Sequence, residues 1–347
     1  MDAHMRLALL IAAALAAVWG LAQAVAQARM EDGPTPQAVM GGPIRQCVNI
    51  GNALEAPTEG EWGHVITERD LDRIAGLGFD TVRLPIAWSE HLDGQGRIDP
   101  AFLARVDEVL RWSELRGLNA ILDVHHFWAL EEDADAHIPT LLGIWDQLAA
   151  HYRNASPRVI FEIVNEPSGD FTVAKVNAVN REALRRIRRT NPDRWVILGS
   201  GAWGTIAPFE TGAREAFEPV SDPRAIATFH TYTPYEFTHQ GVTFADDPPP
   251  VGRSFGGRAD VADVLRELDE AAAFSARSGM PMLLGEFGVY RRTVSLDERL
   301  AWTRFLRAQS EARGLPWCYF DWATEFRMYD PEADEVLPGF RGALGLN

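Results

Sequence analysis

The sequence of 347 residues is poor in cysteine and has no surplus of basic residues. Only two cysteines occur, Cys47 and Cys318, which excludes a disulfide-rich scaffold and a cysteine-based metal cluster. The formal net charge is −16 and the sequence pI is about 5.0, so the chain lacks the basic face that nucleic acids require. We therefore expect no nucleic-acid partner, and an acidic surface is compatible with a neutral substrate.

Long hydrophobic runs are also scarce, and the one that stands out is at the N-terminus. Arg6 precedes an apolar run from Leu7 to about Leu21, and small residues follow, which is typical of a secretory signal peptide. Two small-x-small cleavage patterns, at 24–26 and 26–28, predict a signal peptide over 1–28 and a flexible leader over 29–44. An uncleaved membrane anchor is the alternative, but the run is short for a span and has no basic flank behind it. The mature protein is then expected to be secreted or periplasmic, without a membrane partner.

The rest of the chain alternates between apolar, strand-like segments and amphipathic, helix-like segments. With 46% hydrophobic and 24% charged residues, its composition is that of a globular protein with a large core. Segments apolar enough for strands buried on both faces are 46–51, 80–86, 118–126, 158–165, 194–200, 225–232, 281–287 and 316–322. Helices are predicted at 67–76, 100–116, 138–152, 172–190, 258–278 and 295–313.

This alternation predicts a single α/β domain over 45–347, a (β/α)8 TIM barrel of eight strands and eight helices. A doubly wound sheet is the alternative, but it usually has fewer strands, and no glycine-rich phosphate loop follows the first strand. Polar residues gather at the C-terminal ends of the predicted strands, and in such barrels this end carries the active site. They are Asn49, Asn52, Arg83, His125, Asn165, Glu166, His230, Tyr232, Glu286 and Asp321.

Two carboxylates dominate this predicted mouth. Glu166 ends the fourth strand and Glu286 ends the seventh, and no serine-elbow motif accompanies them. Such a pair suits the cleavage of glycosidic bonds, because one carboxyl group protonates the leaving oxygen while the other, ionised, attacks or activates water. Arg83 and Tyr232 can hydrogen-bond Glu286 and keep it ionised, whereas the aromatic neighbourhood of Glu166 favours its protonated form.

Six motifs carry a resemblance that covers the chain from about Arg45 to its C-terminus. In order they read VNIGNALEAPTEGEWG, VRLPIAWS, DVHH, IVNEPSG, HTYTPYEFTHQG and GEFGVY. They resemble glycoside hydrolase family 5, the old cellulase family A, and within it the branch of bacterial endoglucanases that also accept mannan. The resemblance implies a retaining endo-β-1,4-glucanase that acts on cellulose-like, β-glucan or glucomannan chains. A β-mannanase is the alternative within the same chemistry.

The family's catalytic residues are carried over by motif. Glu166 resembles the acid/base and Glu286 the nucleophile. Asn165 would hydrogen-bond the sugar 2-hydroxyl, an interaction that strengthens in the transition state. Arg83 and Tyr232 would position and ionise Glu286.

The same resemblance places other polar residues along the cleft. His230 would lie near Glu166, and His125 would line the subsite at the point of cleavage. Hydroxyl-binding groups further along the cleft would be Asn52, Glu55 and His126.

The aromatic platform under the sugar is where the sequence departs from the family. The family usually has a Trp on strand eight, and aligning the FRMYD segment puts Phe320 at that position, with Trp322 two residues on. We favour Phe320 slightly and keep Trp322 as the alternative. Phe244 stands where this branch tends to have Trp, and Trp203, after strand five, is a further candidate platform or part of the rim packing.

Metal and cofactor chemistry are not expected. Adjacent strand residues point to opposite faces, so His125 and His126 would be a poor chelating pair, and a catalytic zinc site usually needs three converging ligands. Cys47 and Cys318 lie on neighbouring strands of a closed barrel, and we favour two buried free thiols over a disulfide, because such strands rarely offer the required geometry.

Two further expectations concern the protein as a whole. A catalytically silent carbohydrate-binding barrel is the alternative from another class, but it would have no need to preserve Glu166 and Glu286 together with Arg83 and Tyr232. The sequence shows no binding module and no Ser/Thr/Pro linker, so soluble glucan chains are the expected partner rather than insoluble cellulose, and we expect a monomer.

Overall fold

The computed structural model of the protein describes residues 42–346. The predicted signal peptide and nearly all of the predicted leader lie outside these residues. None of the helices described is long and apolar enough to cross a membrane.

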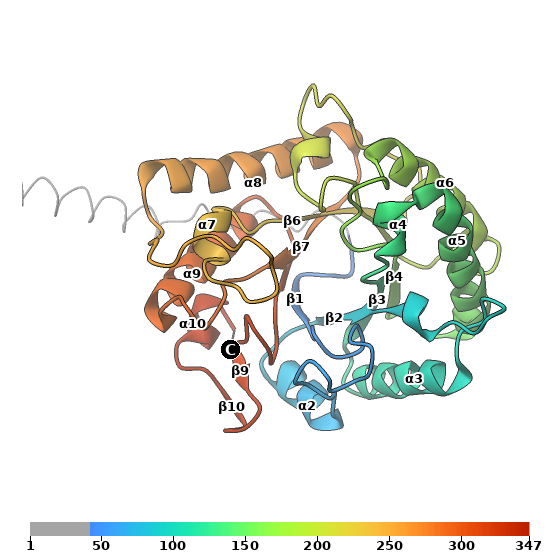
Figure 1. The fold of residues 1–347 in the computed structure, drawn as a ribbon, viewed down its shortest axis with the longest axis horizontal. Coiled ribbons are helices and arrows are strands. Elements are labelled where there is room, and N and C mark those ends of the chain that lie inside the picture. Colours follow the sequence, from blue (N-terminus) through green and yellow to red (C-terminus); the bar gives the residue numbers. More distant parts are fainter. Residues whose placement is uncertain (1–41, 347) are drawn as a thin grey trace, which may run out of the picture.

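Eight parallel strands follow one another around a closed barrel, and the last pairs with the first (Figure 1). This confirms the predicted TIM barrel, because a doubly wound sheet would leave two open edges. The strands are β1 (Gln46–Asn49), β2 (Thr81–Ile86), β3 (Asn119–Val124), β4 (Val159–Glu162), β5 (Val196–Leu198), β6 (Ala225–His230), β7 (Met282–Phe287) and β8 (Trp317–Tyr319). A short hairpin of β9 (Tyr329–Asp330) and β10 (Glu335–Val336) follows β8.

Helices cover the outside of the barrel (Figure 1). They are α2 (Glu68–Gly76), α3 (Pro100–Leu115), α4 (Ala129–Glu132), α5 (Ala134–His151), α6 (Val173–Arg188), α7 (Tyr235–Thr238), α8 (Arg258–Ser278), α9 (Leu296–Ala312) and α10 (Phe340–Ala343). Three 3-10 helices are η1 (Trp88–His91), η2 (Tyr152–Asn154) and η3 (Ala207–Phe209). Between β5 and β6 the described chain forms only η3, so the expected alternation with a full helix fails at this step.

Local capping sets several helix starts. Thr67 and Asp70 form a reciprocal capping box at α2, and the Ser295 side chain accepts from the Glu298 amide at α9. The helix predicted from 138 starts earlier, at Ala134, because the Asp133 side chain accepts a hydrogen bond from the Ala136 amide.

The inside of the barrel has two layers of opposite character. The lower layer is apolar, with residues from seven strands packed together: Cys47, Ile121, Ile160, Ile197, Ile226, Leu283 and Cys318. Side chains two residues further along a strand point into the same interior, and there they form a polar upper layer. The upper layer consists of Asn49, Arg83, Asp123 and Glu162, all of them fully buried.

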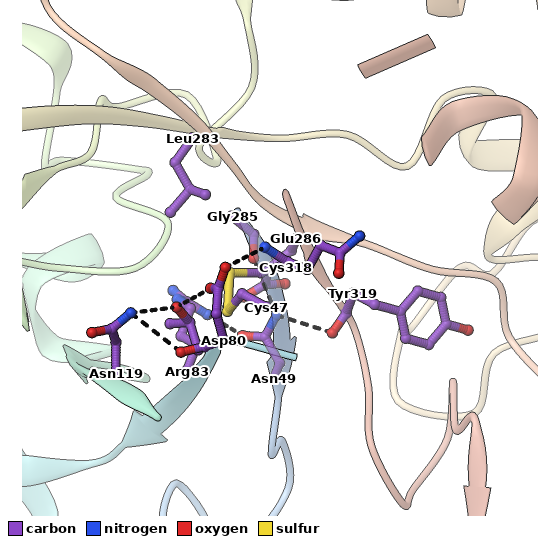
Figure 2. The surroundings of a disulfide bond; sticks show 12 residues. Cys47, Asn49, Asp80, Arg83, Asn119, Leu283, Gly285, Glu286, Cys318 and Tyr319 are labelled. Atoms are coloured by element: carbon purple, nitrogen blue, oxygen red, sulfur yellow. Dashed lines mark hydrogen bonds and ion pairs between the residues drawn. A yellow bond between two sulfur atoms is a disulfide. The ribbon is translucent and has the colours of Figure 1, made fainter. Parts of the chain in front are cut away.

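A disulfide joins Cys47 and Cys318 across the seam between β1 and β8 (Figure 2). Our preference for free thiols is therefore wrong. The strand register pairs the two cysteines directly, with their Cα atoms 4.1 Å apart, and both side chains point into the lower layer. The bond links residues that are 271 positions apart, so it closes nearly the whole barrel covalently.

Candidate active site

Glu286, near the end of β7, is held by two donors. Arg83 Nη1 donates to Oε1 over 2.7 Å, and the Tyr232 hydroxyl donates to Oε2 over 2.8 Å. These are the contacts that the sequence predicted. Burial by itself raises the pKa of the carboxyl group, but the positive charges of His230 and Arg83 and the bond from Tyr232 lower it to about 2. Glu286 is therefore ionised at neutral pH.

Glu166 lies in the loop after β4, four residues beyond its end, and it is the more exposed of the two carboxylates. Its Oε1 is 2.6 Å from Nδ1 of His230, at the end of β6, as expected. Burial raises the pKa of Glu166, His230 opposes this rise, and the negative charge of Glu286 adds to it. The net pKa lies above the ordinary value, which favours a protonated carboxyl group.

The two carboxylates face each other closely. One oxygen of Glu166, one of Glu286 and a ring nitrogen of His230 all lie within 4.8 Å of one another. His230 is 3.8 Å from Glu286, and although burial lowers its pKa, Glu286 and Glu166 together raise it above the ordinary value.

Arg83 organises the upper layer beneath these carboxylates. Its guanidinium donates to Glu162 over 2.7 and 3.0 Å, and lies 2.9 Å from Asp123. It also donates to the side-chain oxygens of Asn49 (2.9 Å) and Asn165 (2.7 Å). The buried Arg83 guanidinium thus pairs with Asp123, Glu162 and Glu286. All of its N–H donors are hydrogen-bonded, which fixes its position.

A chain of hydrogen bonds orients Asn165 and His125. The Asn165 oxygen accepts from Arg83, and its nitrogen lies 3.2 Å from His125 Nε2. On the other side of the imidazole ring, Nδ1 is 2.5 Å from Asp123. Burial, and then the charge of Arg83, lower the pKa of His125 to about 3, so the ring is neutral. Asn165 is 8% exposed and His125 only 3%, and both lie at the floor of the mouth.

The other predicted polar residues lie beside this floor. His126 Nε2 is 3.9 Å from Glu55, which is buried with Oε2 unpartnered and a pKa raised mainly by burial. Asn52 adopts a left-handed backbone with φ 59° and donates to the Thr324 hydroxyl over 2.6 Å. Asp321 accepts from backbone and side-chain groups of its own loop, including Thr324, and so shapes the segment after β8.

The two aromatic residues that follow strand eight, Phe320 and Trp322, differ in their burial. Trp322 is fully buried, donates through Nε1 to Asp70 over 2.9 Å, and stacks on the Tyr329 ring. It offers no face to a sugar, so its assignment as a candidate platform is wrong. Phe320 is half-buried and packs edge-on against Phe326, which leaves it as the strand-eight ring next to the mouth.

A model of the cellulase family, glycosyl hydrolase family 5, matches residues 48–325. The chain belongs to glycoside hydrolase family 5. Among curated relatives, endoglucanase H of Acetivibrio thermocellus is 34% identical over 275 residues, which is 79% of this chain and 29% of that protein. Cellodextrinase A of Ruminococcus flavefaciens is 25% identical over 291 residues, covering 80% of this chain and 82% of the relative.

Solved structures agree with this membership. A hyperthermophilic endo-β-1,4-glucanase in complex with substrate superposes with a TM-score of 0.83 at 34% identity, over 87% of this chain and 97% of the other. Cel5A of Thermotoga maritima with mannotriose gives a TM-score of 0.81 at 34% identity, over 88% and 97%. The family 5 chain spans only 29% of endoglucanase H and 35% of the cellulase/esterase CelE, both of them longer proteins.

Several site residues of this family 5 chain were not predicted from the sequence. Asp123 and Glu162 hold Arg83 from inside the barrel, and the signal was present: each is a lone carboxylate in an apolar strand, where a charge must be paired. Trp62 and Trp128 were also missed. Both are exposed and both contact the His126 ring, with centroid distances of 5.7 and 4.6 Å.

The geometry overturns one of our arguments against a metal site, but it does not favour such a site. β3 ends at Val124 and His126 has a φ of 48°, so both histidines point toward the mouth, with ring centroids 4.5 Å apart, and our opposite-face argument is wrong. Donor atoms of Glu55, His125 and His126 lie within 4.8 Å of one another. His125 is already engaged at both nitrogens, so fewer than the three ligands of a zinc site remain.

Proposed function

We propose that the protein is a retaining endo-β-1,4-glucanase, with Glu166 as the acid/base and Glu286 as the nucleophile. The observation that carries this proposal is the pair itself: two carboxylates with one oxygen of each within 4.8 Å of the other, one with a raised pKa and one with a pKa of about 2. Retaining glycosidases place their carboxyl groups about 5–5.5 Å apart, because the nucleophile must reach the sugar directly.

In the first step Glu286 attacks the anomeric carbon while Glu166 protonates the leaving oxygen. Arg83 and Tyr232 leave Glu286 only its attacking lone pairs and hold the carboxylate in one orientation. Asn165, fixed by Arg83 and His125, presents its amide to the 2-hydroxyl of the sugar, whose hydrogen bond strengthens as charge develops on the ring.

The second step reverses the roles of proton donor and acceptor. Once Glu286 is esterified it carries no charge, so its contribution to the raised pKa of Glu166 disappears. Glu166 gave its proton to the leaving oxygen in the first step, so it now stays a carboxylate and takes a proton from the incoming water, with His230 2.6 Å away to stabilise its negative charge.

The proposed substrate is a β-1,4-linked glucan chain, supported by the endoglucanase names of the relatives and by the neutral hydroxyl-binding floor. β-Mannan is a second candidate, because the 34% identical Thermotoga maritima Cel5A has been solved with mannotriose. We assign substrate contacts to Asn52, Glu55 and His126 at the polar side of the mouth, and to Phe320 and Trp203 as rings.

We also propose that the barrel is a single catalytic domain exported by the predicted signal peptide. The disulfide supports an oxidising compartment, since such bonds form and persist outside the cytosol. Intact mass measurement of the protein recovered from the periplasm or medium tests this: a start after Ala26 or Ala28 is expected, and retention of residues 1–28 would refute it.

Azide rescue tests the catalytic assignment. Glu286→Gly should lower kcat by about 10⁴-fold or more, and azide should restore turnover on an activated aryl glucoside as the α-glycosyl azide. Glu166→Gly should instead yield the β-glycosyl azide, because its nucleophile is intact. The reverse pattern, read by NMR of the products, would show that the roles are exchanged.

A further inference from the structure

The segment at the end of β6 carries one partner of each catalytic carboxylate. His230, the last residue of β6, contacts Glu166, and Tyr232, two residues further on, donates to Glu286 over 2.8 Å. Side chains along an extended chain alternate between two faces. The residues on either side of Tyr232 therefore face the surrounding helices, and both are threonines.

These two threonines share one carboxylate, that of Glu267 in the outer helix α8. The Thr231 hydroxyl donates to Oε2 over 2.5 Å, and the Thr233 hydroxyl donates to Oε1 over 2.7 Å. The Glu267 side chain is only 13% exposed, so most of it is removed from water. One carboxylate thus bridges the residues before and after Tyr232, each through a separate oxygen.

The surroundings of Glu267 indicate that the two hydroxyls, and not a cation, are its main partners. The Arg266 guanidinium is 3.9 Å from Oε1 and pairs more closely with Glu210. Burial raises the pKa of Glu267, and the bonds from Thr231 and Thr233 oppose this rise more than the charge of Arg266 does. A carboxylate that is costly to bury therefore directs its hydrogen bonds to the segment that holds Tyr232.

Two further hydrogen bonds attach this segment to the outer helices. The Thr238 hydroxyl of α7 donates to the Tyr232 carbonyl over 2.6 Å, and the Trp302 indole of α9 donates to the Thr233 carbonyl over 3.1 Å. Both donors belong to fully buried side chains. The backbone around Tyr232 is thus anchored to α7, α8 and α9, while the Tyr232 hydroxyl contacts Glu286.

If the proposed function holds, on which this inference rests, the orientation of Glu286 decides how well it attacks the anomeric carbon. We propose that Glu267 is a positioning residue, which acts from outside the barrel by fixing Tyr232 against Glu286. Loss of its carboxylate frees the side chains of Thr231 and Thr233. The Tyr232 hydroxyl then no longer keeps a fixed distance from Glu286, and the nucleophile samples more orientations.

A double-mutant cycle, measured by steady-state kinetics on cellotetraose, tests this role. Glu267→Ala should lower kcat about 10- to 100-fold and change KM by less than about twofold, because a misplaced catalytic group slows the chemical step. Tyr232→Phe should also lower kcat, since it removes the hydrogen bond to Glu286. In the Tyr232→Phe background, Glu267→Ala should cause less than about a twofold further loss, because the group that it positions is already gone.

Two milder changes separate positioning from folding. Glu267→Gln keeps an oxygen acceptor on the side chain and should recover most of the lost kcat. The joint change Thr231→Val and Thr233→Val removes both hydroxyls with little change in shape, and it should reproduce the kcat loss of Glu267→Ala. The melting temperature of each variant verifies that it is folded, and the valine variant takes the place of Glu267→Ala in the cycle if the latter does not fold.

Asp269→Ala is the matched control. Asp269 is a second carboxylate of α8, and it accepts a hydrogen bond from Arg313, at the end of α9, over 2.7 Å. Because this exposed pair lies outside the segment at the end of β6, its loss should leave kcat unchanged.

The outcomes separate the two proposals. Absence of any cellotetraose cleavage by the parent protein would overturn the proposed function. Cleavage in which Glu267→Ala loses as much kcat in the Tyr232→Phe background as in the parent, or no more than Asp269→Ala loses, would overturn the positioning role and leave the hydrolase assignment intact.

Discussion

The lower and upper layers of the barrel occupy the same interior but obey different physical rules. The lower layer is apolar and closed by the Cys47–Cys318 disulfide, so its burial stabilises the fold. In the upper layer one cation, Arg83, pairs with Asp123 and Glu162 of the same layer and with Glu286 above it. Burial raises the pKa of Asp123 to about 7 in spite of the nearby Arg83, which shows how costly its charge is there. The lower layer therefore stabilises the fold, and the upper layer holds the charged groups that support the candidate active site.

Of the changes considered, the removal of Arg83 should have the largest effect, because it should lower both stability and activity. Arg83→Ala leaves buried carboxylates without a partner, which should cost about 3–5 kcal/mol of unfolding free energy. Because Glu286 also loses its ionising partner, kcat/KM should fall by about 10³-fold or more. Denaturant unfolding and steady-state kinetics measure the two effects, and Arg83→Lys, which keeps the charge but not the fork of donors, should recover only part of either.

Ile160→Ala in the lower layer is the counterpart of that change. It should cost about 2–5 kcal/mol of stability through the cavity it leaves, with kcat near that of the parent wherever the protein stays folded. A loss of kcat comparable to that of Arg83→Lys would mean that the two layers do not divide stability from chemistry.

The disulfide comes next in expected effect. Replacing Cys47 and Cys318 together by Ala should lower stability by about 2–4 kcal/mol, because the bond restrains the unfolded chain over 271 residues. For a domain of this size each kcal/mol shifts Tm by about 2–4 °C. Calorimetry of the parent with and without reductant should show the same drop, and kcat at moderate temperature should not change. A drop in kcat in the double variant would show that the disulfide between β1 and β8 also affects the active-site residues at the mouth.

The two carboxylates above the upper layer, Glu166 and Glu286, should set the pH profile. A raised pKa keeps Glu166 protonated to higher pH, so the alkaline limb of kcat/KM lies above the ordinary value of 4.5. The pKa of Glu286, lowered to about 2, moves the acid limb far below the working range. Above the pKa of Glu166, activity should fall about tenfold per pH unit, and Glu166→Gln should remove that limb with activated substrates. A profile unchanged in Glu166→Gln would assign the limb to another group.

The smallest predicted effect is at the top of the mouth. Phe320→Trp should lower the barrier by about 0.5–1.5 kcal/mol, a 2- to 12-fold gain in kcat/KM, because indole offers a larger face to the distorted sugar. The control is Trp322→Ala, which removes a buried stacked ring and should cost stability rather than activity. Unchanged kinetics in both Phe320→Ala and Phe320→Trp would exclude strand eight from the sugar site.

The fold and the pair Glu166 and Glu286 could be predicted from the sequence, because both have local sequence patterns. Apolar strands at regular spacing predict a parallel barrel, and its topology brings every C-terminal strand end to one mouth, so residues far apart such as Arg83 and Glu286 could be placed together. Trp128 had no such signature, because it stands at the start of the short helix α4, whose position depends on contacts with the segment around Gly169.

What the sequence by itself determined, then, is the barrel, the acid and nucleophile candidates, and the partners of Glu286. The tertiary structure alone decided the rest. Strand register, which no single strand encodes, paired Cys47 with Cys318 in a disulfide and not as free thiols. The turn after β3 brought His126 to the same side as His125. Packing around Asp70 and Tyr329 drew Trp322 into the core and left Phe320 at the mouth, because burial of an indole depends on which neighbours the closed barrel provides.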